Sequence, residues 1–234
     1  MGDPLGAAKD DVIFTEREFG FSYHSALGML HYLVHTRPDI QYAVNCCSRF
    51  AHAPKRIHGE AIRRIVRYLR YTKDRGIVYK AKQGEIEFDC YVDFDFQSLF
   101  GYEDPLDSNS ARSRTGYVFT LGGNAIHVVS KLKTQIALSS TESEYVGISM
   151  ALREFVPVRQ TAMLICKTFD VNTGPNNQMK STIWEDNNGA LKNAQAKRIT
   201  PRTRHINCCR NQYCSSRAEA TVIADPRIIL PFLI

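Results

Sequence analysis

The sequence contains no apolar run that approaches the roughly 18 residues needed to cross a membrane as a helix. Its first residues, Met1-Gly2-Asp3-Pro4, have neither the basic start nor the apolar stretch of a secretory signal. The seven cysteines are odd in number and no two are spaced as Cys-x-x-Cys, which argues against a disulfide framework and against a zinc site. We therefore expect an intracellular protein, cytoplasmic or nuclear, with reduced thiols and no membrane partner.

The composition is that of an ordinary globular protein, with 44% hydrophobic and 23% charged residues in a chain of 234. This length accommodates one large domain, or one domain with an appended segment. The formal net charge of +6 is compatible with a polyanionic partner, but many proteins without such a partner are mildly basic.

The order of the patterns along the chain divides it into three parts. Residues 1–20 are polar without periodicity and are predicted to be a loose lead-in. Residues 21–75 are predicted to be helical, with helices at 23–33, after Pro38, and at about 57–71. Residues 76–234 mix strand and helix patterns and are predicted to form one α/β domain with a mixed sheet.

The helix expected at 57–71 carries many cations, and two interpretations of them stay open. A row of arginines is compatible with a solvated helix face, and it is equally compatible with a surface that follows a phosphate backbone. Tyr68 and Tyr71 would then stack on bases, or pack in the core. The apolar side is predicted to contain Ala61, Ile65, Tyr68 and Leu69, and the cations proposed for nucleic-acid binding are Arg63, Arg67, Arg70 and Lys73.

The stretch from Glu85 to Asp95 alternates polar and apolar residues, as expected for a half-buried strand. The two-residue period places its apolar side chains on one face and its acids on the other. The segment at 76–79 is predicted to pair with it as a hairpin around Gly84. Further strands are predicted at 115–121 and 125–130, joined by a tight turn at Gly122-Gly123-Asn124, and at 181–184 and 220–223.

Two sequence features bear on the helices predicted within residues 76–234. Ser139-Ser140-Thr141-Glu142 is a strong helix start, with hydroxyls for the cap and acids in the first turn. Pro157 is expected to interrupt the helix that follows. Residues 97–114 are predicted to be a loop, and a further helix is predicted at 188–196.

Three acidic stretches lie far apart in the sequence, at the end of the 85–95 strand, at 141–144 and at 184–187. Acids at strand ends and at a helix start form an oxygen-rich set that suits Mg²⁺ or Mn²⁺. A pair of such ions can activate a water molecule and stabilise the leaving oxygen in phosphodiester cleavage. The pattern alone does not establish this site, because acidic strand ends are common.

Several ordered motifs resemble copia-type LTR retrotransposon polyproteins, across the end of the reverse transcriptase region and the ribonuclease H region. The resemblance covers about residues 21–207, and its most specific run is Ala137 to Tyr145. The other motifs are Tyr23 to Leu33, Thr36-Arg37-Pro38-Asp39-Ile40, Arg67 to Lys73, Ser113 to Phe119, Gly122 to Ile126, Asp186 to Ala190 and Arg202 to Ile206.

The resemblance implies a ribonuclease H-like fold for about residues 76–234, preceded by a small helical connection. It also implies cleavage of the RNA strand of an RNA–DNA hybrid by four acids and two metal ions. The first three acids fall on Asp93, Glu144 and Asp186, with Asp95 and Glu142 as the less favoured neighbours. No general-base histidine is required, so His127 and His205 are expected to be structural.

The fourth acid departs from the family pattern, because Asp225 in Ala224-Asp225 imitates the motif but comes too early after Arg204-His205-Ile206. Two hypotheses therefore stay open. One is a Mg²⁺-dependent endonuclease acting on RNA–DNA hybrids. The other is an inactive retrotransposon relic that retains the fold and weak nucleic-acid binding.

Overall fold

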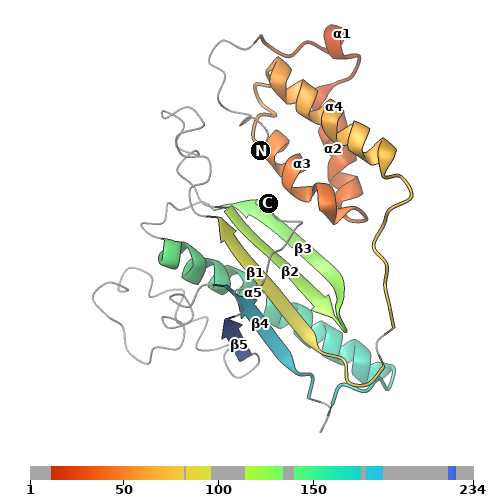
Figure 1. Ribbon diagram of the computed structural model, residues 1–234, viewed down its shortest axis with the longest axis vertical. Coiled ribbons are helices and arrows are strands. Elements are labelled where there is room, and N and C mark those ends of the chain that lie inside the picture. The colour runs from red at the N-terminus through yellow and green to blue at the C-terminus, as the bar shows by residue number, and fades with distance from the viewer. Residues whose placement is uncertain are drawn as a thin grey trace. The chain divides into compact units, whose positions relative to one another are not determined.

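The computed structural model describes residues 12–81, 83–95, 114–133, 140–174, 178–186 and 221–224, and at 94–95, 140–143, 145 and 221–224 it describes the backbone alone. The chain forms two compact units, and the division falls between Ile77 and Val78 (Figure 1). Among the described residues, no helix is long and apolar enough to cross a membrane.

The first unit is a small group of helices around an apolar core. It contains α1 (Glu16–Phe19), α2 (Tyr23–Val34), the 3₁₀ helix η1 (Pro38–Ile40), α3 (Gln41–Ser48) and α4 (Arg56–Tyr71). Phe14 and Phe19, within the predicted lead-in, are buried and stack with ring centroids 4.9 Å apart. A single short helix and two isolated rings leave no periodic signal, which explains why the sequence pattern missed this ordered segment.

The motif Thr36-Arg37-Pro38-Asp39-Ile40 joins the start of η1 to the end of α4. Arg37 donates two hydrogen bonds to Asp39, at 2.9 and 2.6 Å, and two to Thr72, through its carbonyl and its hydroxyl. Tyr68 donates its hydroxyl to Asp39 at 2.9 Å. Burial alone would raise the pKa of Asp39, but these hydrogen bonds lower it overall.

The phase of α4 differs in part from the prediction. Ile62 and Ile65 are buried, whereas Tyr68, predicted on the apolar side, is 41% exposed and turns its hydroxyl to Asp39. Gly59 lies where α4 meets two rings, and a Cβ at this position would come within 2.7 Å of Phe19. The close approach of the aromatic rings therefore requires glycine here.

The second unit is a mixed sheet with the strand order β3-β2-β1-β4-β5. Its strands are β1 (Phe88–Asp95), β2 (Arg114–Leu121), β3 (Asn124–Leu132), β4 (Ser181–Glu185) and β5 (Thr221–Ala224). The first three are antiparallel neighbours, and β4 and β5 run parallel to β1. The α/β class with a mixed sheet flanked by helix is confirmed.

The helix α5 (Ser140–Thr168) lies along one face of this sheet (Figure 1). As predicted, Phe88, Cys90 and Val92 share one face of β1, and they pack in one core with residues of α5. Phe155 is fully buried, with its ring 4.7 Å from Phe88. Truncation of such a ring typically costs about 3–5 kcal/mol.

The predicted interruption at Pro157 is wrong, because α5 continues through it. Proline removes one backbone donor and crowds the preceding turn, but tertiary packing compensates. Phe155 and Ala162, on either side of Pro157, are both buried in the core, and Thr161 donates its hydroxyl to the Pro157 carbonyl at 3.0 Å.

The hairpin prediction for 76–79 is also wrong, since these residues form no strand. Directly after this segment, the Lys80 backbone is bound by Asn124, whose side chain accepts from the Lys80 amide and donates to the Lys80 carbonyl. The predicted turn between β2 and β3 is confirmed. Gly122 and Gly123 have φ values of 57° and 80°, as a two-residue hairpin turn requires.

Candidate active site

The register of two parallel strands brings Asp93 and Asp186 to the same edge of the sheet. Tyr91 on β1 pairs with Trp184 on β4, and their rings stack at 6.2 Å. Continuing this register by two residues places Asp93 level with Asp186, which follows directly after the last residue of β4. Neighbouring strands lie about 4.8 Å apart, so the two carboxylates belong to one small region.

Glu144 reaches the same region from α5, one turn before the helix packs on the sheet at Ile148. Its side chain is buried, and the Oε2 atom has no hydrogen-bond partner among the described residues. Burial, followed by the charges of Asp186 and Asp93, raises the pKa of Glu144 to about 7, while Lys133 acts in the opposite direction. We call Asp93, Glu144 and Asp186 the acid cluster.

Three further charged side chains are buried in the chain around this end of the sheet. Arg114 begins β2 and pairs in register with Asp95, Lys133 follows β3, and Glu185 ends β4. The Glu185 carboxylate accepts from the Asp186 amide at 3.2 Å, which holds the chain at the strand end. The sequence pattern included Glu185 only as part of the acidic stretch at 184–187 and missed Arg114 and Lys133, because single charges at strand ends give no sign of their burial.

The donor set of the acid cluster fits a hard divalent cation, since all its ligand atoms would be carboxylate oxygens. The Oε2 atom of Glu144 has no hydrogen-bond partner among the described residues, and burial together with the nearby acids raises the pKa of this carboxyl. Within the described part of the chain, however, no three acidic, histidine or cysteine side chains converge closely enough to form a metal-binding group. The acids are electrostatic neighbours rather than an assembled ligand set.

Other predicted site residues lie outside this description. Asp225 and His205 are not among the described residues, and neither is the helix predicted at 188–196. For Asp95 and Glu142 the structure gives the backbone position only, within β1 and the first turn of α5 respectively.

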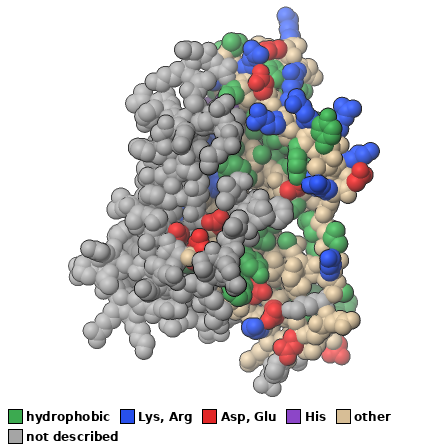
Figure 2. Space-filling view, viewed as in Figure 1, with side chains coloured by type: hydrophobic (Ala, Val, Ile, Leu, Met, Phe, Trp, Pro, Cys, Tyr) green, Lys and Arg blue, Asp and Glu red, His purple; other side chains and the backbone are tan. Residues whose placement is uncertain are grey.

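The four cations proposed for nucleic-acid binding separate into two kinds. Arg63 is engaged within the first unit: it donates to the carbonyls of Glu18 and Phe19 and lies over the Phe19 ring at 4.4 Å. Arg67, Arg70 and Lys73 are exposed. Figure 2 shows Lys and Arg side chains gathered with hydrophobic ones over the helices of this unit.

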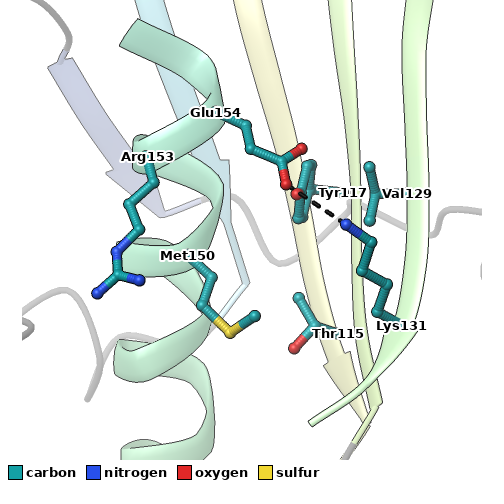
Figure 3. Close-up of a pocket in the computed structure, with 7 residues that line it drawn as sticks. All are labelled: Thr115, Tyr117, Val129, Lys131, Met150, Arg153 and Glu154. Carbon is teal, nitrogen blue, oxygen red and sulfur yellow. Dashed lines mark hydrogen bonds and ion pairs between the residues drawn. The ribbon is translucent and has the colours of Figure 1, made fainter. Parts of the chain in front are cut away.

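A separate pocket of about 140 Å³ lies between α5 and the β2–β3 hairpin (Figure 3). Glu154 points from α5 toward the sheet, where Lys131 approaches it at 3.5 Å and His127 at 3.1 Å. Burial would raise the pKa of Glu154, but hydrogen bonds from Tyr117 and His127 lower it overall. This network attaches α5 to the hairpin, and it gives His127 a structural position.

No protein-family model matches the chain. It is 34% identical over 185 residues to the retrovirus-related Pol polyprotein from transposon TNT 1-94 of Nicotiana tabacum, covering 79% of this chain and 12% of that protein. It is 38% identical over 127 residues to the corresponding polyprotein from transposon RE1 of Arabidopsis thaliana, covering 54% of this chain and 8% of that protein.

A third relative is short. The secreted RxLR effector protein 161 of Plasmopara viticola is 38% identical over 135 residues, which cover 57% of this chain and 89% of that protein. The chain thus spans nearly all of this relative, but only about a tenth of the two polyproteins.

Two solved structures resemble the chain more weakly. LC11-RNase H1 from compost has a TM-score of 0.36 at 15% identity, over 60% of this chain and 85% of that chain. The foamy viral protease-reverse transcriptase dRH in complex with double-stranded DNA has a TM-score of 0.47 at 12% identity, over 89% of this chain and 32% of that chain. Because both TM-scores are below 0.5, the fold class is assigned from the strand order of the sheet and not from the superposition on these two structures.

Proposed function

We propose that the second unit is a ribonuclease H-like endonuclease, because the chain belongs to the family of retrovirus-related Pol polyproteins from copia-type transposons. The substrate would be the RNA strand of an RNA–DNA hybrid, and the reaction would depend on Mg²⁺ or Mn²⁺. One observation carries the proposal: the strand ends of β1 and β4 bring Asp93 beside Asp186, where both act on the buried Glu144.

The acid cluster has the chemistry that this reaction requires. Divalent ions, two by the family resemblance, would supply Lewis-acid activation of water and stabilisation of the leaving oxygen. Asp93 lies in β1 and Asp186 directly follows β4, the neighbouring strand of the hydrogen-bonded sheet, which limits their movement. Glu144 adds a third carboxylate from a helix that is packed on the same sheet. The chain therefore holds its acids on rigid elements, as positioned catalysis demands.

Recognition of the hybrid would rest on phosphates and 2′-hydroxyls rather than on base edges, so cleavage would be largely independent of sequence. In the first unit, Arg67 and Arg70 on the exposed face of α4, and Lys73 in the turn that follows the helix, are available for phosphate contacts. Arg67 and Arg70 are separated by one helical turn, and like charges at this spacing repel each other slightly unless an anion lies between them. We propose this face as a nucleic-acid surface, with Arg63 as a structural residue.

The test of the nuclease is cleavage of a labelled RNA–DNA hybrid in the presence and absence of Mg²⁺, with Asp93→Asn as the control. We expect cleavage of the RNA strand by the unmodified chain, and a loss of at least about 100-fold in the variant. Equal rates for the two chains would refute the nuclease.

The alternative function is nucleic-acid binding without catalysis by an inactive relic. It is favoured by the finding that the described residues form no assembled metal-binding group. Hybrid binding that weakens steeply with salt, without cleavage by the unmodified chain, would establish it. In either case Arg67→Gln should weaken binding and reduce the salt dependence, whereas Arg63→Gln should mainly lower the stability of the first unit.

A further inference from the structure

Tyr71, the last residue of α4, is 82% exposed, more than any other large hydrophobic side chain among the described residues. The sequence left open whether Tyr68 and Tyr71 pack in the core or stack on bases. Both rings lie outside the core, with Tyr68 41% exposed. Single exposed aromatic rings are common on protein surfaces, so exposure alone does not indicate a partner. The residues around Tyr71 are therefore decisive.

The neighbours of Tyr71 on the surface of α4 follow from helical spacing, since residues three and four apart lie side by side. Tyr68 and Arg67 precede Tyr71 by three and four residues, and Arg64 precedes them by the same two intervals. Both arginines are exposed. Figure 2 shows hydrophobic side chains lying among Lys and Arg side chains over the helices of this unit. We call Arg64, Arg67, Tyr68 and Tyr71 the α4 patch.

The charge of the α4 patch is positive and is not compensated by the acid beside it. Asp39, which accepts from the Tyr68 hydroxyl, already forms an ion pair with Arg37 at 2.6 Å. The Arg37 guanidinium also lies over the Tyr68 ring, 5.7 Å from its centroid, so this ring is held in place. Among the residues that the structure describes, Arg64 and Arg67 have no ion-pair partner.

We propose that the α4 patch binds single-stranded nucleic acid, with an unpaired base stacked on Tyr71 and neighbouring phosphates on Arg64 and Arg67. The inference rests on the nucleic-acid surface proposed above for α4, and it names the form of nucleic acid and the residue that distinguishes it. Aromatic rings beside cations suit unpaired bases of any sequence, because every base has a π face. In a duplex these faces are covered by the neighbouring bases, so only the phosphates are offered.

A single strand accounts for both kinds of residue in the patch, whereas other occupants account for one kind. A duplex would use Arg64 and Arg67 but leave the Tyr71 ring in water. An apolar protein surface would cover the ring, but it would bury two guanidinium groups without partners, which is costly. A tyrosine side chain also has only two rotatable torsions, so little conformational entropy is lost when a base orders it.

The experiment measures binding by fluorescence anisotropy, on the full chain in EDTA so that no metal-dependent cleavage occurs. The probes are a labelled oligothymidylate strand and a blunt RNA–DNA hybrid. We expect Tyr71→Ala to weaken binding of the strand about tenfold and to leave binding of the hybrid unchanged. Tyr71→Phe should bind like the unmodified chain, and Tyr71→Leu, which has no π face, should bind like Tyr71→Ala.

Tyr32→Ala is the matched control. Tyr32 is 78% exposed in α2, a helix without lysine or arginine, so its replacement should leave binding of both probes unchanged. The salt dependence separates the ring from the charges. Arg67→Gln should reduce the slope of log affinity against log salt by about 0.7 for the strand, whereas Tyr71→Ala should lower affinity without changing the slope.

Two results would overturn the stacking while leaving the nucleic-acid surface of α4 in place. One is an unchanged affinity of both Tyr71→Ala and Tyr71→Leu for the strand, and the other is an equal loss on the strand and on the hybrid. If the unmodified chain binds neither probe, the surface and this inference are both refuted. The nuclease proposed for the second unit is tested separately, by cleavage of the hybrid in Mg²⁺.

Discussion

Replacing Glu144 by glutamine should change the free energy of unfolding of the second unit in a pH-dependent way. Relative to the unmodified chain, the variant should be more stable at pH 8 than at pH 4. The pKa of Glu144 is about 7 in the folded protein, against an ordinary value of 4.5. A raised pKa in an acid means that the folded state favours the protonated form. The stability that Glu144 contributes is therefore complete below pH 4.5 and is lost as the pH rises through 7.

The size of this loss follows from the two pKa values. Each unit of difference corresponds to about 1.4 kcal/mol, so ionisation of Glu144 costs about 3 kcal/mol at pH 8 without metal. Glutamine cannot ionise and escapes this cost. Its buried amide lacks a partner for at least one group, at about 1–3 kcal/mol, but this penalty is the same at every pH. The pH dependence of the difference, and not its absolute value, is diagnostic.

The assay is urea unfolding in EDTA at several pH values between 4 and 8. The free energy of unfolding of Glu144→Gln, relative to that of the unmodified chain, should increase by about 3 kcal/mol across this range. Glu142→Gln removes an equal charge from the first turn of α5, and should lower stability by about 0.3–1 kcal/mol through the helix dipole. Parallel pH curves for Glu144→Gln and the unmodified chain would show that Glu144 is not in the environment described.

Two further predictions concern the first unit. Gly59→Ala should destabilise it despite the usual gain of about 1 kcal/mol for alanine in a helix, because the new Cβ would meet Phe19 at 2.7 Å. Gly28→Ala, in α2 with nothing within 4 Å, should give the ordinary gain, and thermal unfolding of the two variants compares them directly. Asp39 has a lowered pKa, so its stabilising effect is present above the ordinary value of 3.8 and is lost as the pH falls through the folded value. Asp39→Asn should cost about 3 kcal/mol near pH 7, because Arg37 would keep a buried charge without its partner, and this cost should shrink in acid.

Local patterns predicted the second unit well where one interaction decides the structure. The two-residue period of β1 assigned Phe88, Cys90 and Val92 to the core, since an alternating strand has only one way to bury its apolar face. The Gly122-Gly123 turn was predictable for a similar reason, because positive φ at both positions is unfavourable for other residues. The residues that determine the structure of such segments lie within a few positions of one another.

The same local reasoning failed where distant contacts decide. Pro157 lacks the backbone donor that a helix uses, but Phe155 and Ala162 on either side of it are packed in the core and keep the helix continuous. Val78 and Tyr79 have the residue types of a strand, yet both are exposed and form no strand. Helical spacing placed Tyr68 on the apolar side of its helix, whereas its side chain is 41% exposed and its hydroxyl donates to Asp39. For Pro157 and Tyr68, the contacts that decide the structure come from segments too far along the sequence to be read from the local pattern.

The acid cluster combines both situations. The resemblance to a family supplied the identities of Asp93, Glu144 and Asp186, while the strand register supplied the reason why two of them are neighbours. Neither source contained Lys133, because a lysine after a strand is ordinarily exposed. The sequence therefore indicated which acids lie near one another, but not which charges are buried around them.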